Sequence, residues 1–283
     1  MANNIELAQK FVPVIDEIYK KASVTSVLDA TTQIDFTGTN TVKVMKIETT
    51  ALGDYSKENG YPEGDVTVTW EALQLAEDRG KEFSIDRMDN EETLGQAFGG
   101  AMGNFMTVHV GPEVDAYRFS KYASAEGIGT TAANLADGEA VVKALRAAIT
   151  AMDEDEVPAE NRVLFITPTL YGLVQDLDTT KSKEVFKRFS NVVEVPQTRF
   201  YSAITLNSGA GSWGYAKGAD AKDINFMVVA KSAILQAKKF ALPKIFDPDT
   251  NQDKDAWKFQ FRLYHDAFTF ENKVNGIYVH TKA

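Results

Sequence analysis

Between residues 40 and 86 apolar and polar residues alternate, the period typical of a half-buried strand. This pattern predicts strands over 40–48, 65–75 and 78–86. Turn-forming residues fill positions 53–65, so the first two strands should form a long hairpin, with Val66, Val68 and Trp70 on one face. Because a two-stranded hairpin is only marginally stable in water, this face should lie on another surface, in this chain or a neighbour.

Two helical patterns flank the hairpin. Residues 4–21 carry apolar residues at three- and four-residue steps around a proline, which predicts an amphipathic helix that is kinked or begins late. Asp89 and Glu92 have the spacing of a capping box, and a long helix should run from 90 to about 122, kinked at Pro112. The apolar stripe that predicts this helix is Leu94, Phe98, Met102, Phe105 and Met106.

Residues 137–250 have the pattern of a compact α/β module. A helix carrying Val141 and Leu145 leads to a buried strand at 162–167, and Thr167 then caps a helix with Pro168 at its first position. Further strands are expected at 191–195, 200–206, 224–230 and 276–280. One more strand should present large apolar side chains on a single face: Trp257, Phe259, Phe261 and Leu263.

Composition narrows the class of protein. The chain has 283 residues, of which 44% are hydrophobic, enough for one large or two smaller globular modules. Its formal net charge of −10 disfavours nonspecific binding to phosphate backbones. It has no cysteine, hence no disulfide or thiolate metal site. The sequence shows neither a signal peptide nor an 18-residue apolar run, so we expect a soluble protein made in a cytoplasm, with no membrane partner.

The stretch FDPDTNQDKDAW, residues 246–257, is the richest group of possible metal ligands. It places oxygen-bearing side chains at alternate positions: Asp247, Asp249, Asn251, Asp253 and Asp255. A calcium loop needs glycine at its sixth position and glutamate at its twelfth, but these positions hold Gln252 and Lys258. We therefore expect a polar turn between two strands and no metal ligand here.

Other motifs also favour structural interpretations. Gly209, Gly211 and Gly214 in GAGSWG match a dinucleotide fingerprint, but turn and strand residues follow where a helix is needed, so a glycine-rich hairpin is expected. The three histidines are scattered, and no GxSxG serine-hydrolase motif is present. The acidic run 153–156 should be a solvated loop. The sequence therefore predicts no catalytic, cofactor-binding or metal residues and no cofactor.

One basic cluster stays open to two interpretations. Lys181, Lys183, Lys187 and Arg188 are either an exposed helix face or a contact with acidic residues of another subunit.

Several stretches, in this order, carry a resemblance: residues 51–93, 162–174, 192–201, 224–240 and 244–268. Together they resemble the major capsid protein of tailed bacteriophages, the Hong Kong ninety-seven type of shell fold. That resemblance implies an α+β fold with an N-terminal arm, an extended β-hairpin loop, a peripheral domain with a long spine helix, and an axial domain. The implied bounds are 1–30 for the arm, 39–86 for the loop, 31–38, 87–133 and 231–271 for the peripheral domain, and 134–230 and 272–283 for the axial domain.

The resemblance also implies a function. The chain would be a structural virion protein and no enzyme, made in the bacterial host, that self-assembles into pentamers and hexamers of an icosahedral shell around phage double-stranded DNA. The extended loop residues Val66, Val68 and Trp70 would contact neighbouring subunits. A portal and a separate scaffolding protein would be its partners, and DNA would be enclosed without sequence-specific binding.

Two alternatives remain open at this stage. The same fold builds shells of bacterial nanocompartments, which hold cargo enzymes in place of DNA. The other alternative is a soluble α/β enzyme that uses GAGSWG or the Asp-rich turn.

Overall fold

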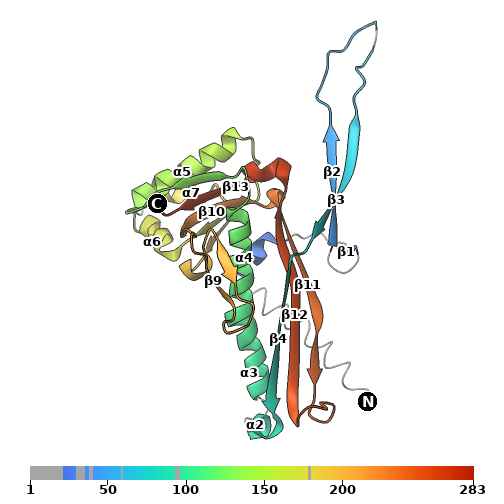
Figure 1. Cartoon of the computed structure of the whole chain (residues 1–283). Helices are drawn as coiled ribbons and strands as arrows, with labels where there is room; N and C mark the ends of the chain where they lie inside the picture. The colour runs from blue at the N-terminus through green and yellow to red at the C-terminus, as the bar shows by residue number, and fades with distance from the viewer. Residues whose placement is uncertain (1–21, 30–35, 38–40, 59, 93–95, 178–179) are drawn as a thin grey trace.

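The structure is a computed structural model that describes residues 22–29, 36–37, 41–58, 60–92, 96–177 and 180–283. The helix predicted over 4–21 lies outside the described residues. Three parts are visible in Figure 1: a compact α/β part that contains the C-terminus, a long narrow part, and a hairpin that projects away from both.

A five-stranded sheet forms the centre of the compact part. Its order is β5 (Gly129–Ala132), β13 (Ile277–Thr281), β10 (Ile224–Ala230), β6 (Arg162–Ile166) and β7 (Asn191–Glu194). β10 runs antiparallel to both neighbours, whereas β5 and β7 pair in parallel with β13 and β6. Every residue of β6 and β10 is buried, as their continuous apolar runs require. Three helices accompany the sheet: α5 (Gly138–Glu154), α6 (Pro168–Asp176) and α7 (Thr180–Phe186).

The long narrow part combines a three-stranded sheet with a long segmented helix that begins at Arg87 and ends at Ala123, here called the spine helix. β12 (Ala256–Thr269) lies between β11 (Ile234–Phe246) and β4 (Glu77–Asp86), antiparallel to both. Met102 on the spine helix shares a core cluster with Phe259 and Phe261 of β12, and the ring of Phe105 lies 5.5 Å from that of Phe261. The apolar stripe of the predicted helix therefore packs on this strand through Met102 and Phe105, whereas the side chain of Phe98 lies outside the described residues.

The spine helix is built from several segments. It comprises α2 (Arg87–Glu92), α3 (Gln96–Asn104), a π-helical turn over Phe105–Val110 and α4 (Gly111–Ala123). Pro112 sits in the first turn of α4 and has no N–H to donate to the preceding turn, so the irregularity expected from it takes the form of the wider π turn. The capping box predicted at Asp89 and Glu92 is wrong, because α2 begins at Arg87, and Asp86 accepts a hydrogen bond from the backbone N–H of Met88 at 2.9 Å.

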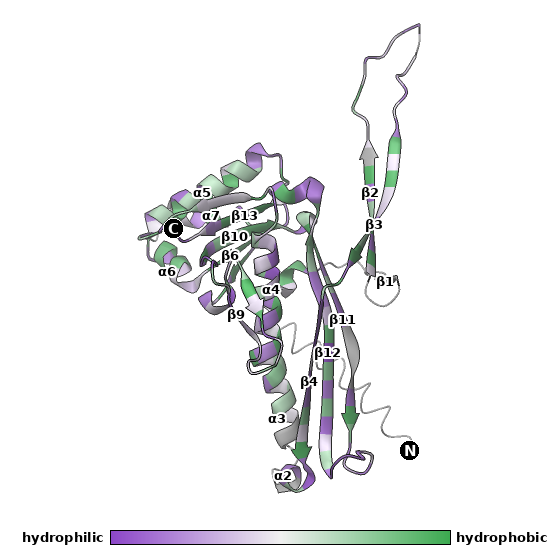
Figure 2. Cartoon of the chain, viewed as in Figure 1, coloured by the Kyte–Doolittle hydropathy of each residue, from purple (hydrophilic) through white to green (hydrophobic). Residues whose placement is uncertain are grey.

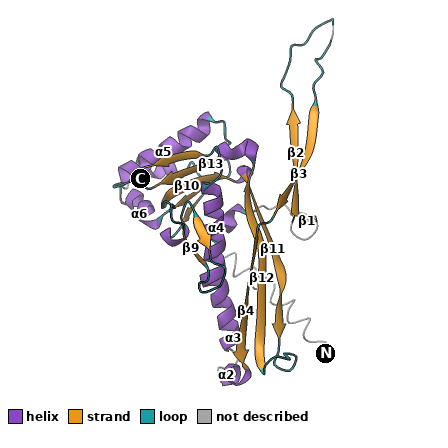
Figure 3. Ribbon diagram, viewed as in Figure 1, coloured by secondary structure: helices purple, strands orange, loops and turns teal. Residues whose placement is uncertain are grey.

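The projecting hairpin consists of β2 (Thr41–Thr49) and β3 (Val66–Gln74), with the short β1 (Phe36–Thr37) beside β2. Beyond the strand ends its tip is loop (Figure 3). Only its root joins a core: Val42 and Leu75 are buried in a cluster with Ala237 of β11. The hairpin predicted from alternation is confirmed, and most of it extends beyond the body of the described chain.

Several short elements complete the fold. β8 (Ile204–Leu206) and β9 (Tyr215–Lys217) form a two-stranded antiparallel sheet, which shortens the strand predicted over 200–206. Short 3₁₀ segments lie at Val24–Leu28, Gln197–Arg199, Lys231–Ala233 and Glu271–Gly276, the last of them kinked at Lys273. Helix α6 begins at Pro168 after Thr167 as predicted, although the Thr167 hydroxyl makes no capping hydrogen bond.

Candidate functional site

The hairpin presents an apolar face that no described residue covers. In the antiparallel register Met45 lies opposite Trp70, and Ile47 lies opposite Val68. Directly opposed residues share a face, and every second residue along a strand repeats it. We call this set, which is Met45, Ile47, Val66, Val68 and Trp70, the hairpin face; each member is 49–67% exposed. Figure 2 shows green, hydrophobic bands alternating with near-white, intermediate ones along the outer part of β3.

The opposite face of the hairpin is polar in its outer part, where Lys46 lies opposite Thr69 and Thr67 follows on the same side of β3. Nearer the root this face carries Val42 and Leu73. The ribbon is therefore amphipathic, with one face suited to water and one suited to an apolar surface. The tip also exposes apolar groups, since Tyr61 is 86% exposed and its ring lies 5.0 Å from that of Tyr55.

A buried carboxylate fixes the root of the hairpin to the spine helix. Asp266 of β12 accepts hydrogen bonds from the backbone N–H of Ala76 and from the Tyr117 hydroxyl, each at 2.9 Å. Ala76 is the link between β3 and β4, so this carboxylate holds the point where the hairpin leaves the long sheet. Burial, with the Asp266 charge beside it, raises the pKa of Tyr117 well above its usual range, so the hydroxyl stays protonated and donates.

A second buried carboxylate joins the segment 22–29 to the spine helix. Asp115 is fully buried and accepts hydrogen bonds from the hydroxyls of Ser23 and Thr25, each at 2.7 Å, and from the backbone N–H of both Val24 and Thr25. Arg199 completes the arrangement with an ion pair to Asp115 at 3.2 Å. Sequence reasoning missed this cluster; the available signal was an acidic residue at helical spacing from Phe119 and Tyr122, on the face that they bury.

The GAGSWG segment is the hairpin between β8 and β9, as the sequence predicted. Gly209, Gly211 and Gly214 all have positive φ, a conformation that glycine adopts without the steric cost of a side chain. Arg79 of β4 donates to the carbonyl of Asn207 at 2.9 Å and forms an ion pair with Glu113 of the spine helix at 2.7 Å. The segment is followed by β9, so it does not offer the helix N-terminus that a dinucleotide site uses.

Solved structures of capsids share this arrangement over nearly the whole chain. The capsid of the cyanophage P-SCSP1u aligns with a TM-score of 0.60 and 15% identity, covering 93% of this chain and 88% of that one. A virus-like particle from Pyrococcus furiosus aligns at 0.58 with 12% identity, covering 96% and 98%. The mature capsid of bacteriophage PhiM1 aligns at 0.54 with 13% identity, covering 87% and 82%.

The chain has the phage capsid fold. The fold expected from the resemblance of the sequence is thereby confirmed. No protein-family model and no curated protein matches the sequence. The hairpin occupies the place of the expected extended loop, and the helix from α2 to α4 that of the expected spine helix.

Within this capsid fold the Asp-rich stretch is a turn between β11 and β12, as predicted. Asp247 accepts hydrogen bonds from the N–H and hydroxyl of Thr250 at 2.7 and 2.6 Å. Asp249 pairs with Arg87 at 3.1 Å, and Asp253 pairs with Lys258 at 3.0 Å. These carboxylates point to partners within the chain, and the described residues contain no group of three or more His, Cys, Asp or Glu side chains placed to hold a metal ion.

The remaining charged motifs lie apart from the hairpin face. Asp153, in the acidic run predicted to be a solvated loop, instead sits in the last turn of α5 and pairs with Arg162 at 2.7 Å and Arg188 at 2.6 Å. One member of the basic cluster therefore has an acidic partner within the chain. His109 is exposed on the π turn, whereas His280 is buried and its Nδ1 lies 3.0 Å from the side-chain nitrogen of Asn225.

None of the described helices is long and apolar enough to cross a membrane.

Proposed function

We propose that this chain is the repeating subunit of an icosahedral capsid shell, assembled from pentamers and hexamers around phage double-stranded DNA. The observation that carries the proposal is the hairpin face, because five large apolar side chains lie on one side of a paired two-stranded ribbon with no cover in the described chain. Contiguous exposed apolar surface of this kind marks a contact with another protein. The capsid fold makes a second copy of the chain the natural partner.

The role we propose is structural and involves no chemical step. Heterologous contacts between identical subunits close into rings, and rings of five and six subunits together close a shell. A net charge of −10 limits adhesion to the enclosed DNA. In this scheme the protein resides in the virion, is made in the bacterial host, and works with a portal and a separate scaffolding protein.

The domain division expected from the sequence is part of this proposal. Residues 39–86 form the extended loop, and residues 134–230 with 272–283 form the axial domain. β4 (77–86) is hydrogen-bonded to β12 along its length, so that part of the loop is also a strand of the long sheet. The region free to reach a neighbour is accordingly β2, β3 and their tip.

Electron microscopy of the purified protein tests the proposal directly. We expect closed, uniform particles from the wild-type chain. Deleting residues 53–64, the hairpin tip, should leave a folded subunit that forms no particles. A wild-type chain that elutes as a small oligomer at every concentration, or normal particles from the deletion, would contradict the proposal.

The shell of a bacterial nanocompartment is the second candidate. The alignment with the virus-like particle from Pyrococcus furiosus covers 98% of that chain, as complete a match as any of the phage capsids gives. The contents of the particles distinguish the two functions. Nuclease-protected double-stranded DNA in particles from the native host indicates a virion, whereas a co-purifying enzyme indicates a nanocompartment.

A further inference from the structure

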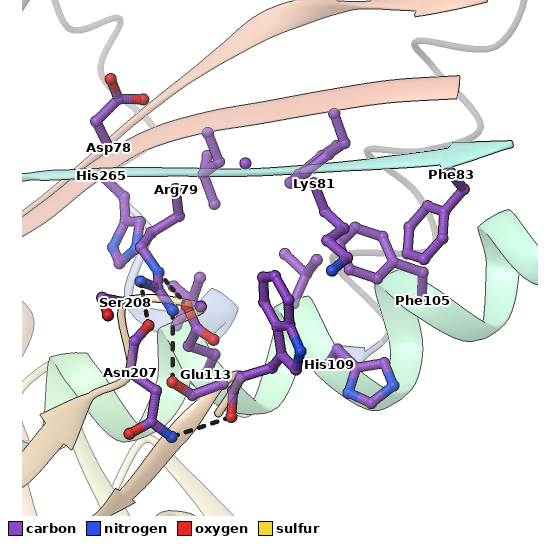
Figure 4. Close-up of a pocket in the computed structure, with 18 of the residues that line it drawn as sticks. Asp78, Arg79, Lys81, Phe83, Phe105, His109, Glu113, Asn207, Ser208 and His265 are labelled. Carbon is purple, nitrogen blue, oxygen red and sulfur yellow. Dashed lines mark hydrogen bonds and ion pairs between the residues drawn. The ribbon is translucent and has the colours of Figure 1, made fainter. Parts of the chain in front are cut away.

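A cavity of about 550 Å³ lies between the spine helix, the long sheet and the GAGSWG hairpin. Its volume falls within the range of ~300–1,000 Å³ that is usual for small-molecule sites. In Figure 4, Phe83 and Phe105 lie toward one end, and Arg79, Glu113 and Asn207 lie toward the other. Lys81 lies beside the two phenylalanine rings, so this side of the cavity combines an aromatic wall with a cation, as an aromatic anion requires (Figure 4).

The π turn of the spine helix supplies part of the apolar wall. Phe105 and His109 both belong to the turn and both line the cavity. The rings of Phe83 and Phe105 meet edge to face with centroids 4.8 Å apart, and Phe261 extends the same wall. The π turn that precedes Pro112 thus places an aromatic ring and an imidazole on the cavity wall.

Trp213 and Lys81 form a cation–π pair at the cavity. Trp213 is 66% exposed, and Nζ of Lys81 lies 3.2 Å from the centroid of its ring. A Cβ atom at position 209 would lie 2.5 Å from the indole ring of Trp213. Because Gly209 has no side chain, the ring can lie against the hairpin backbone. Lys81 has no ion-pair partner among the described residues, and its charge is available to an anion.

His265 lies buried behind the cavity wall as an unsatisfied polar group. The side chain is fully buried, and neither ring nitrogen has a hydrogen-bond partner within the described part of the chain. Burial lowers its pKa to about 3, so the ring is neutral and offers one donor and one acceptor. Its ring nitrogens are closed off from the cavity space itself, so a ligand would be held by the aromatic wall and Lys81.

We propose that this cavity binds a small aromatic anion. The ring system of the ligand packs against Phe83, Phe105 and Trp213, and its acidic group pairs with Lys81. The proposal is independent of shell assembly, because the cavity lies wholly within one chain.

Titration of unassembled subunits with anilinonaphthalene sulfonate, a fluorescent aromatic anion, tests this directly. We expect saturable binding of one probe per subunit with an enhanced, blue-shifted emission. Lys81→Met keeps the apolar stem and removes the charge, so it should weaken binding by about tenfold, the value of one charge-assisted contact. Phenylnaphthylamine, which has the same rings and no sulfonate, should bind wild type and Lys81→Met equally.

Controls separate the cavity from the hairpin face, the other apolar surface. Trp70→Ala should bind the probe as wild type does, whereas Trp213→Ala should bind it several-fold more weakly. Lys81→Gln serves if Lys81→Met proves unstable in a thermal melt. Equal sulfonate affinity of wild type and the Lys81 variant would overturn the proposal, as would loss of binding in Trp70→Ala. If Lys81→Met and Trp213→Ala instead bind the probe normally but block particle formation, the cavity is a contact between copies and the ligand is ruled out.

Discussion

Two strands rich in β-branched and aromatic residues, β10 and β3, differ sharply in burial. All seven residues of β10, INFMVVA, are buried between β13 and β6. In β3, VTVTWEALQ, only Leu73 is even partly buried, although the strand carries Val66, Val68 and Trp70. The local sequence suits a strand in both cases. The difference is that other parts of the same chain pack over the side chains of β10, whereas no described residue packs over the apolar side chains of β3.

This difference separates the surfaces that fold the subunit from those that are free to bind another. Burial of apolar area stabilises the compact part, so its free energy of unfolding depends on residues such as those of β10. The hairpin face contributes little to that free energy while it stays exposed. Its apolar area becomes favourable only when a second surface removes it from water. Substitutions in the two strands should therefore affect two different measurements.

The largest effect on subunit stability is expected from Phe226→Ala in β10. Phe226 is fully buried and stacks on His280 with centroids 4.9 Å apart. Truncation of a buried Phe to Ala costs about 3–5 kcal/mol, a large part of the ~5–15 kcal/mol that typically holds a domain folded. A denaturant titration of unassembled subunits measures the loss. Tyr61→Ala at the exposed tip is the control, and a Phe226→Ala midpoint equal to that of Tyr61→Ala would show that the β10 core is misplaced.

Elements that have a clear apolar pattern of their own could be predicted from the sequence. The continuous apolar runs of β6 and β10 and the alternation of β3 were all found. β11 was not predicted as a strand, because Lys238, Lys239 and Pro243 interrupt its pattern, and its 13 residues are held by the ladder to β12. β5 was missed for a related reason: GTTA is small and polar, and it becomes a strand through parallel pairing with the distant β13.

The candidate site shows the same limit. Val66, Val68 and Trp70 were predicted to share a face because a strand repeats every two residues, but their partners across the ribbon, Met45 and Ile47, depend on the register. The environment of Asp115 could not be predicted, because its partners lie 84 to 92 positions away along the chain. The cavity joins residues of β4, the spine helix and the GAGSWG hairpin, which only the tertiary fold brings together.

Substitution at the root of the hairpin should also lower the free energy of unfolding of the subunit, but by less than Phe226→Ala does. Tyr117→Phe removes one hydrogen bond to the buried Asp266 carboxylate, which keeps those from the N–H groups of Ala76 and Ala267. Loss of a hydrogen bond to a charged group costs about 1.5–3 kcal/mol. A denaturant titration checks this, with Tyr55→Phe at the exposed tip as the matched control. Equal midpoints for the two variants would mean that the hydroxyl contributes nothing at the root.

Substitution of the hairpin face should leave subunit stability almost unchanged and abolish assembly. For the triple variant Val66→Ser, Val68→Ser and Trp70→Ser we expect an unfolding free energy within about 0.5 kcal/mol of wild type per substitution, as for surface positions generally. Particles should be absent from electron micrographs, because the apolar area that another subunit covers is gone.

The polar side of the same ribbon provides the control. Thr67→Ala with Thr69→Ala alters the same strand without touching the hairpin face, and this variant should form normal particles. Particles from the triple variant, or none from the control, would show that the hairpin face is not the contact surface.

The smallest effect on stability and assembly is expected at the Asp-rich turn, which has the largest group of possible metal ligands in the sequence. Asp249 and Asp253 are 81% and 74% exposed, and their pairs with Arg87 and Lys258 are surface ion pairs, which contribute little to stability. The turn itself is held by Asp247 and Thr250, which both substitutions leave in place. Asp249→Ala with Asp253→Ala should therefore melt and assemble as wild type does, in the presence of a chelator as in its absence. Wild-type particles that dissociate in chelator and return on addition of calcium would instead make this turn a metal site, with a role in assembly that its hydrogen bonds do not suggest.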